Sequence, residues 1–377
     1  MEKNLGAKKQ MRNSSDRLQY LDVLRGVAAY VVVAGHFFAE GWVKSLPLVN
    51  LITDTKLSVC IFFILSGVVL TSPNGPQKLG TFWLLAQVAA RLVRLAIPVF
   101  CVSIFVWFLT YFSLFFSGTL PTGYEFWEVY SGYTHKDLDF MRVLYFSWIE
   151  TFFLYDSSTS LIPPAWTMRP EFIGSIVVFT HTWLSQKTLY FKSPILLLFI
   201  STILISTYGY LPLIYYFSFF LTGVALRKLL DENLGWSSSE KWNYLPVLML
   251  IMVLGCKTFL EFFNIDSFQL DFLFAGLIVF YLMRAKKLHR LICWKPLLWL
   301  AKISFPLYLL HVPLIASFGL SILNYLGKIG LSPEVGQFVT FGALSLGLFL
   351  LAQLFYPTEL LAIHLSRKVR HLSKYKR

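Results

Sequence analysis

The chain has 377 residues, of which 56% are hydrophobic, 18% aromatic and only 14% charged. Its mean hydropathy of +0.62 excludes an ordinary water-soluble globular domain. The composition therefore indicates an all-α polytopic integral membrane protein. The net charge of +13 does not indicate a nucleic-acid partner, because lysine and arginine are concentrated in alternate connections between apolar runs.

Ten runs are apolar and long enough to cross a membrane, so we expect a bundle of about ten transmembrane helices. These runs are residues 21–41, 55–72, 93–116, 166–184, 193–209, 211–228, 243–262, 268–284, 297–323 and 335–357. A single transmembrane domain is expected over 21–363, between a basic cytoplasmic segment at 1–20 and a basic cytoplasmic tail at 364–377. No short apolar run with a cleavage site precedes the first span, so we expect no removable signal peptide.

The positive-inside rule places both termini in the cytoplasm, and the same basic segments predict attraction to anionic membrane lipid. In this topology 117–165 is the longest outer connection. Its tyrosines and tryptophans suit a lid or a sugar-contacting surface, but a solvated loop fits equally well. The run at 145–155 has the pattern of a short interfacial helix. The acidic residues of this connection are Glu125, Glu128, Asp137, Asp139, Glu150 and Asp156.

Arg25 and His36 lie eleven residues apart in the first predicted span, LDVLRGVAAYVVVAGHFF. Ionisable side chains inside a membrane are costly and mark functional sites by default. At about 1.5 Å per residue the two are roughly 16 Å apart along the helix, and three turns return them to one face. We therefore expect both to line one cavity. The alternative is an arginine at the membrane edge and a histidine that only packs.

Arg91 and Arg94 are three residues apart in ARLVRLAIP, at the cytoplasmic mouth of the third predicted span. Two guanidinium groups on one helical face suit a bidentate phosphate clamp, while simple anchoring at the cytoplasmic surface explains them too.

Glu171 follows a proline-rich entry to the fourth predicted span, in AWTMRPEFIG. A carboxylate at that depth needs a partner. We expect a tertiary partner such as His36, and a purely structural ion pair is the alternative.

Ser304, Tyr308 and His311 follow one another in ISFPLYLLHVPL of the ninth predicted span. Tyr308 lies one turn after Ser304, and His311 three residues further on, so they can share a face. For His311 a helix-packing role is the alternative. The four cysteines have no paired spacing, so neither a disulfide framework nor a zinc or other metal site is indicated.

A histidine and a carboxylate in a dry pocket can act as a base and its orienting partner in acyl transfer to a hydroxyl. With arginines that hold a phosphorylated donor, this set indicates transfer of a group from a cytosolic activated carrier to an acceptor at the membrane. The same residue types also form proton relays, so a proton-coupled transporter of a sugar or lipid is the alternative.

Five motifs, in order along nearly the whole chain, resemble the membrane-bound acyltransferase family 3, typified by polysaccharide O-acetyltransferases. They are Arg25 and His36 with ten residues between them, VCIFFILSG with Ser66, ARLVRLAIP with Arg91 and Arg94, AWTMRPEFIGS with Trp166 and Glu171, and ISFPLYLLHVP. Two positions depart from the family pattern. Cys60 replaces a residue that is often acidic, and Phe305 replaces the usual tyrosine.

The resemblance implies O-acylation by a plasma (inner) membrane enzyme of the cell envelope. Its expected substrates are acyl-CoA, with acetyl-CoA as the typical donor, and a carbohydrate or glycolipid acceptor. No tightly bound cofactor is expected. It makes His36 the catalytic residue, as base or acyl relay, with Glu171 as its partner, and makes Arg25, Arg91 and Arg94 donor-binding residues. Further candidate pocket residues are Asp22, which we expect to pair with Arg25, and Ser66, Trp166, Ser304, Tyr308 and His311.

Overall fold

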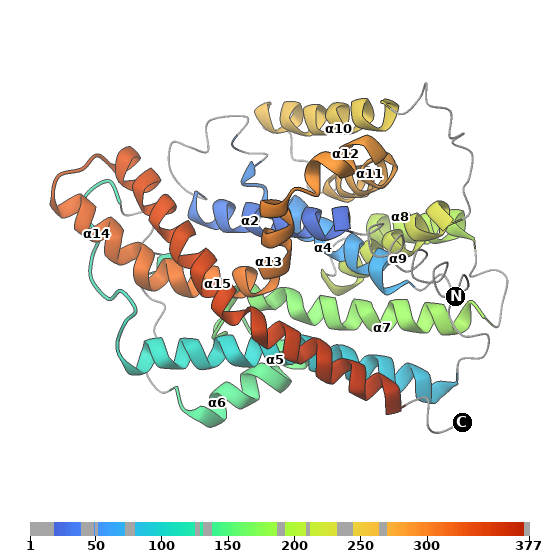
Figure 1. Cartoon of the computed structure of the whole chain (residues 1–377), viewed down its shortest axis with the longest axis horizontal. Coiled ribbons are helices and arrows are strands. Elements are labelled where there is room, and N and C mark those ends of the chain that lie inside the picture. Colours follow the sequence, from blue (N-terminus) through green and yellow to red (C-terminus); the bar gives the residue numbers. More distant parts are fainter. Residues whose placement is uncertain are drawn as a thin grey trace, which may run out of the picture.

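The computed structural model describes residues 19–38, 49, 52–71, 80–124, 129–130, 138–186, 193–208, 212–231, 244–263 and 270–372. Within these ranges the chain forms helices and connections and no strand, so the predicted all-α class is confirmed (Figure 1). Each of the ten predicted runs coincides with helical structure. The α-helices are α2 (Gln19–Phe37), α4 (Thr55–Leu70), α5 (Thr81–Tyr111), α6 (Phe140–Tyr145), α7 (Met168–Leu184), α8 (Pro194–Tyr208), α9 (Pro212–Asp231), α10 (Leu245–Phe262), α11 (Asp271–Arg284), α12 (Lys286–Ile292), α13 (Lys295–Leu314), α14 (Leu320–Lys328) and α15 (Pro333–Leu372). Two π-helical segments, η3 (Phe146–Leu154) and η7 (Ile315–Gly319), and a 3₁₀ turn, η4 (Pro163–Thr167), complete the described helices.

Four helical segments are long and apolar enough to cross a membrane by length and composition. They are Gln19–Phe37, Thr81–Tyr111, Lys295–Lys328 and Pro333–His371, and Thr55–Leu70, Pro194–Leu204 and Leu245–Leu260 are shorter apolar helices. These segments are compatible with an integral membrane protein, whereas about ten crossings remain a prediction. The boundaries differ most at α5, which begins twelve residues before the predicted span, and at α15, which ends fifteen residues after it.

Two large apolar clusters form the interior. One is built mainly by α4, α9 and α11, and the other by α2, α5, α13 and α15. Figure 1 shows α5 and the second half of α15 side by side, in agreement with their extensive packing. Helix α2 contacts both α13 and α4, so it lies where the two clusters meet.

Close backbone contacts between helices depend on small residues. An added Cβ at Gly26 of α2 would lie 2.8 Å from the backbone of Ala301 in α13, and one at Gly67 of α4 would lie 2.3 Å from the carbonyl oxygen of Phe220 in α9. Small residues permit such contact between membrane helices. Gly26 therefore fixes the distance between α2 and α13, the helices with Arg25, His36, Tyr308 and His311.

A buried charged cluster joins three helices on the α10 side of the bundle. Lys257 of α10 is 2% exposed and pairs with Asp271 at the start of α11 and with Asp54, 3.2 Å away, which caps the start of α4. Buried charges require such compensation. The cluster therefore ties α10 and α11 to α4, an arrangement that the sequence analysis did not predict.

The connection at 117–165 contains more helix in its described part than a solvated loop. The run predicted as a short helix at 145–155 is the π-helical continuation of α6, and Asp139 caps α6 through the Arg142 amide at 2.6 Å. Buried Glu150 pairs with Arg142 and accepts a hydrogen bond from Thr159 at 3.0 Å. Asp156 accepts hydrogen bonds from Ser158 at an exposed turn. Glu125, Glu128 and Asp137 lie outside the described residues, as do 1–18 and 373–377 of the basic termini.

Candidate active site

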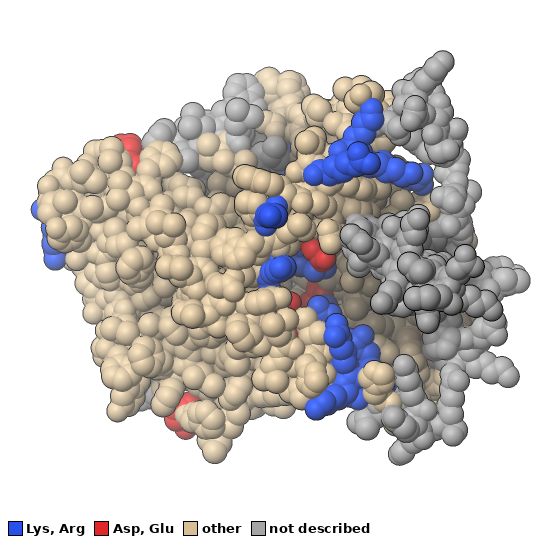
Figure 2. Space-filling view, viewed as in Figure 1, with Lys and Arg blue, Asp and Glu red and all other residues tan. Residues whose placement is uncertain are grey.

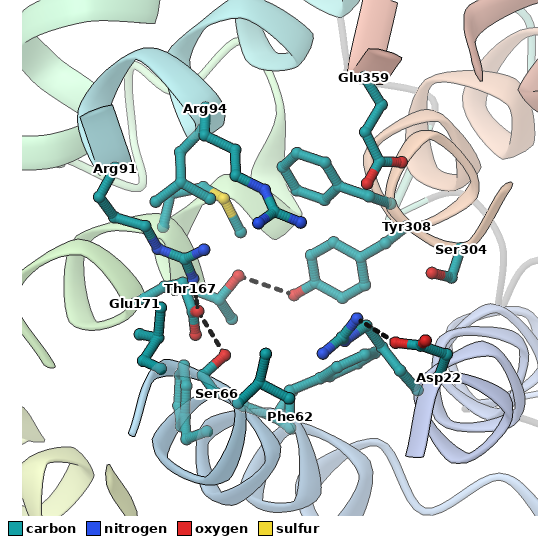
Figure 3. A pocket seen from close by; sticks show the side chains of 18 of the residues that line it. Asp22, Phe62, Ser66, Arg91, Arg94, Thr167, Glu171, Ser304, Tyr308 and Glu359 are labelled. Carbon is teal, nitrogen blue, oxygen red and sulfur yellow. Dashed lines mark hydrogen bonds and ion pairs between the residues drawn. The ribbon is translucent and has the colours of Figure 1, made fainter. Parts of the chain in front are cut away.

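A cavity of about 220 Å³ lies among α2, α4, α5, α7, α13 and α15 (Figure 3). We call it the arginine cavity. Its charged lining consists of Asp22, Arg25, Arg91, Arg94, Glu171 and Glu359, and its neutral polar lining of Ser66, Thr167, Ser304 and Tyr308. The remaining lining is apolar. The cavity thus brings together most of the predicted site residues from five separate motifs.

One side of the arginine cavity is formed by an ion pair between Arg91 of α5 and Glu171 in the first turn of α7. Ser66 of α4 also donates a hydrogen bond to the Glu171 carboxylate at 2.5 Å. The Arg91 Nε donates to the Ser175 hydroxyl at 3.0 Å, and Ser175 donates to the backbone oxygen of Glu171 at 2.6 Å. Three helices therefore meet at one satisfied polar cluster.

This cluster changes the expected role of Glu171. Among the described residues, no hydrogen bond or ion pair joins Glu171 to His36, so the expected contact is wrong, and the alternative of an ion pair with another residue holds. Arg91 and Ser66 already occupy the carboxylate. Arg91 is correspondingly held by protein groups, and an external phosphate is not needed to satisfy it.

Arg94 and Arg25 face the cavity differently from Arg91. Figure 3 shows Arg94 extended into the cavity, and within the described chain its guanidinium has no hydrogen-bond partner. Arg25 pairs with Asp22 at 3.1 Å, which confirms the predicted contact; the two side chains are 28% and 54% exposed. Exposed pairs of this kind contribute little stability. Arg94 is therefore the cation most available to a ligand.

His36 opens onto a different cavity, of about 440 Å³, which we call the His36 cavity. Its described lining is His36, Val129, Tyr130, Pro163, Pro164, Trp166 and Val312. The expectation that Arg25 and His36 line one cavity is therefore wrong for the described cavities. Side chains on one face of a helix point in the same direction. Arg25 and His36 are nevertheless eleven residues apart along α2, so they reach different cavities.

The hydrogen bond of the His36 ring determines which of its nitrogens carries the proton. Its Nδ1 is 2.9 Å from the Val32 carbonyl oxygen, which can only accept, so Nδ1 holds the proton and donates. The neutral ring then has its lone pair on Nε2. Tyr130 donates its hydroxyl proton to the His36 backbone oxygen at 2.8 Å. His36 is thus a half-buried imidazole whose neutral form has Nε2 as its basic nitrogen.

A small hydrogen-bonded group separates the two cavities. Tyr308 and Thr167 line the arginine cavity, whereas Pro164 lines the His36 cavity. The Pro164 carbonyl oxygen lies 3.0 Å from the Thr167 hydroxyl and 3.2 Å from the Tyr308 hydroxyl, and the two hydroxyls are 3.0 Å apart. The 3₁₀ turn of η4, set by consecutive prolines, positions this carbonyl. Tyr308, Thr167 and Pro164 form the partition between the cavities.

His311 packs against the ring of His36 and is fully buried. Its ring centre is 4.9 Å from that of His36, and its Nδ1 donates to the Tyr308 carbonyl oxygen at 2.6 Å. Its Nε2 has no hydrogen-bond partner within the described part of the chain. His311 is not part of the described lining of either cavity. Ser304 does line the arginine cavity, with its hydroxyl bonded to the Ala301 carbonyl oxygen at 2.8 Å.

Three residues at these cavities were missed by the sequence analysis. Glu359 enters the arginine cavity from α15, beyond the predicted end of the tenth span at 357. A lone carboxylate in the apolar run YPTELLAIH was a signal that could have identified it. Thr167 directly follows Trp166 in the motif AWTMRPEFIGS, which was a signal for it. Tyr130 had no such signal, because a tyrosine is common in any connection.

Comparison with known proteins identifies the family. The acyltransferase family 3 model, described as an acyltransferase domain, matches residues 18–356. No curated protein and no solved structure gave a significant match. The match covers most of the chain. It includes every residue that lines the two cavities except Glu359. The chain therefore belongs to acyltransferase family 3 and is an acyltransferase with apolar helices compatible with a membrane protein.

Proposed function

We propose that this protein transfers an acyl group, typically acetyl, from acyl-CoA to a hydroxyl group of a carbohydrate or glycolipid acceptor. The observation that supports this most strongly is the hydrogen bond of the His36 ring and its position in the His36 cavity. Its Nδ1 is held by the Val32 carbonyl oxygen, which leaves Nε2 as a base in a cavity lined by Tyr130 and Trp166. Aromatic rings suit the apolar face of a sugar, and the hydroxyl to be acylated then lies near the base.

In the direct route, His36 Nε2 takes the proton of the acceptor hydroxyl as the oxygen attacks the thioester carbonyl carbon. The carbon–sulfur bond breaks, and the proton on His36 passes to the leaving thiolate. In the relay route, Nε2 attacks the thioester carbonyl carbon, the carbon–sulfur bond breaks and CoA leaves as the thiolate. The acceptor oxygen then attacks the acyl carbon on His36, the bond from this carbon to Nε2 breaks, and the hydroxyl proton passes to the thiolate. Both routes return His36 to its neutral form.

The donor would enter the arginine cavity, so its thioester must meet His36 at the partition. Pro164 is common to the partition and the His36 cavity, and Tyr308 and Thr167 form the opposite side. Either route therefore places the reacting carbonyl near Pro164 and Tyr308. We further propose an inner-membrane location with both termini in the cytoplasm, from the distribution of lysine and arginine.

The test is transfer of label from acetyl-CoA, radioactive in its acetyl group, to an envelope-glycan fraction by purified protein in liposomes. Wild type should label glycan, and His36→Gln should not, because an amide has similar size but no basic nitrogen. His364→Gln, on the exposed surface of α15, is the matched control and should retain transfer. Undiminished transfer by His36→Gln would refute the role of His36, and absence of transfer by wild type would refute this donor and acceptor pair.

A further inference from the structure

The charges in the arginine cavity cancel. Its lining contains three arginines, Arg25, Arg91 and Arg94, and three carboxylates, Asp22, Glu171 and Glu359. A site for several phosphate groups needs an excess of positive charge, and carboxylates close to phosphate are repulsive. The described cavity has no such excess. The sequence-based expectation of a phosphate clamp at Arg91 and Arg94 therefore does not match its electrostatics.

The size of the cavity leads to the same conclusion. Its volume is about 220 Å³, below the roughly 300–1,000 Å³ of pockets that enclose drug-sized ligands. This volume is small for a whole nucleotide with its phosphates and favours a slender chain. Apolar atoms form most of the surface of the cavity, and its apolar residues include Phe62, Phe63 and Met168. The space suits a narrow, uncharged ligand segment with a few hydrogen-bonding groups.

Arg94 and Glu359 are the two charged residues of the cavity lining that make no hydrogen bond to another described residue. Glu359 interacts electrostatically with Arg94 and Arg25, but neither Arg94 nor Glu359 makes a hydrogen bond to another described residue. Figure 3 shows both side chains directed into the cavity, Arg94 from α5 and Glu359 from α15. A guanidinium only donates and a carboxylate only accepts. Together they match a group that offers both a carbonyl oxygen and an N–H, such as an amide.

Basic side chains begin outside the cavity. Helix α15 continues from Glu359 to exposed Arg367 and Lys368, about 12 Å further along its axis. Arg370, on the next turn, interacts electrostatically with Arg91 and Arg94. Figure 2 shows lysine and arginine side chains in two bands on this face, with acidic side chains between them. The excess positive charge thus surrounds the cavity and does not fill it.

We infer that the arginine cavity binds the uncharged pantetheine arm of the donor, with Arg94 and Glu359 on its amides, and that the phosphates stay at the basic rim on α15. This inference rests on the proposed function, since it takes acyl-CoA as the donor. It assigns Arg94 to an amide carbonyl oxygen and Glu359 to an amide N–H. It also directs the thioester end of the arm toward Tyr308 and the partition.

The test compares CoA with pantetheine, which has the same arm and no nucleotide or phosphate. Dissociation constants are measured by calorimetry in detergent under reducing conditions, for wild type, Arg94→Gln, Glu359→Gln and the double variant Arg367→Gln/Lys368→Gln. We expect each cavity variant to weaken both ligands by about tenfold, the usual effect of one lost hydrogen bond to a charged group. The rim variant should weaken CoA by a similar factor and pantetheine by far less.

Lys328→Gln, an exposed charge removal at the end of α14, is the matched control and should alter neither constant. Thermal unfolding of each variant shows whether it is folded, and Arg94→Lys replaces Arg94→Gln if the latter is unstable. The inference is refuted if the Arg94 variant weakens CoA alone, or if wild type does not bind pantetheine. Binding does not require turnover, so wild type that binds both ligands as expected but transfers no acyl group would refute the proposed function alone.

Discussion

The two cavities differ in how they use charge. The arginine cavity has six ionisable side chains that compensate one another, whereas the described lining of the His36 cavity has His36 alone as a titratable base beside Tyr130. The first arrangement suits binding, because paired charges hold helices and offer hydrogen bonds in fixed directions. The second suits chemistry, because a neutral imidazole without a nearby counter-charge keeps its lone pair. Under the proposed function, this difference assigns donor binding to the arginine cavity and proton transfer to the His36 cavity.

The largest effect should come from the His36 cavity. His36→Ala should lower acyl transfer at least about 100-fold, since general bases contribute 100-fold or more. The apparent KM for the donor should change little, because His36 does not line the arginine cavity. Steady-state kinetics with acetyl-CoA measure both values. A large rise in KM with unchanged kcat would place His36 in donor binding and remove the distinction between the cavities.

Glu171→Gln should have the next largest effect, and on stability. It leaves the Arg91 guanidinium buried without a counter-ion, and breaking a buried pair costs about 3–5 kcal/mol. Thermal or denaturant unfolding in detergent measures this loss, with Glu334→Gln on the exposed first turn of α15 as the control.

Replacing both Arg91 and Glu171 distinguishes a structural role of their ion pair from a role in activity. The double variant Arg91→Met/Glu171→Met removes both charges, and such replacements are often neutral for stability. It should be more stable than Glu171→Gln. If it regains stability but still lacks transfer, the pair also contributes to activity. If Glu171→Gln is as stable as wild type, the ion pair is not a structural requirement.

Tyr308→Phe should have a moderate effect at the partition. It removes the hydroxyl bonded to Thr167 and Pro164, at a cost of about 1 kcal/mol. A loosened partition admits water between the cavities, so CoA release without acceptor should rise relative to acyl transfer. Thiol release and label transfer are measured in parallel, with exposed Tyr325→Phe as the control. An unchanged ratio would show that the hydroxyl does not separate the two processes.

Asp22→Asn should have the smallest effect. Its pair with Arg25 is partly exposed, and such pairs contribute about 1 kcal/mol or less. Unfolding should be nearly unchanged, and donor affinity should change less than in Arg94→Gln. A larger loss of donor affinity than in Arg94→Gln would make Arg25, with Asp22 to orient it, the principal donor-binding cation.

The sequence alone determined the all-α class of the protein, the position of its long helices and most of the polar residues that line the arginine cavity. Hydropathy and residue spacing are local properties. They predicted ten runs that all coincide with helical structure, and the motifs with Arg25, His36, Arg91, Arg94 and Glu171. The pairing of Asp22 with Arg25 was also predictable, because residues three apart on a helix are neighbours.

The tertiary structure decided which of these residues meet. Arg91 and Glu171 are 80 positions apart and pair only because α5 packs on α7, so no local pattern could choose Arg91 over His36 as the partner of Glu171. Glu359 reaches the arginine cavity because α15 packs along α5 and α13. The division into two cavities likewise depends on Pro164, Thr167 and Tyr308, which come from separate segments. Contacts across helices follow from packing, and packing is a property of the whole chain.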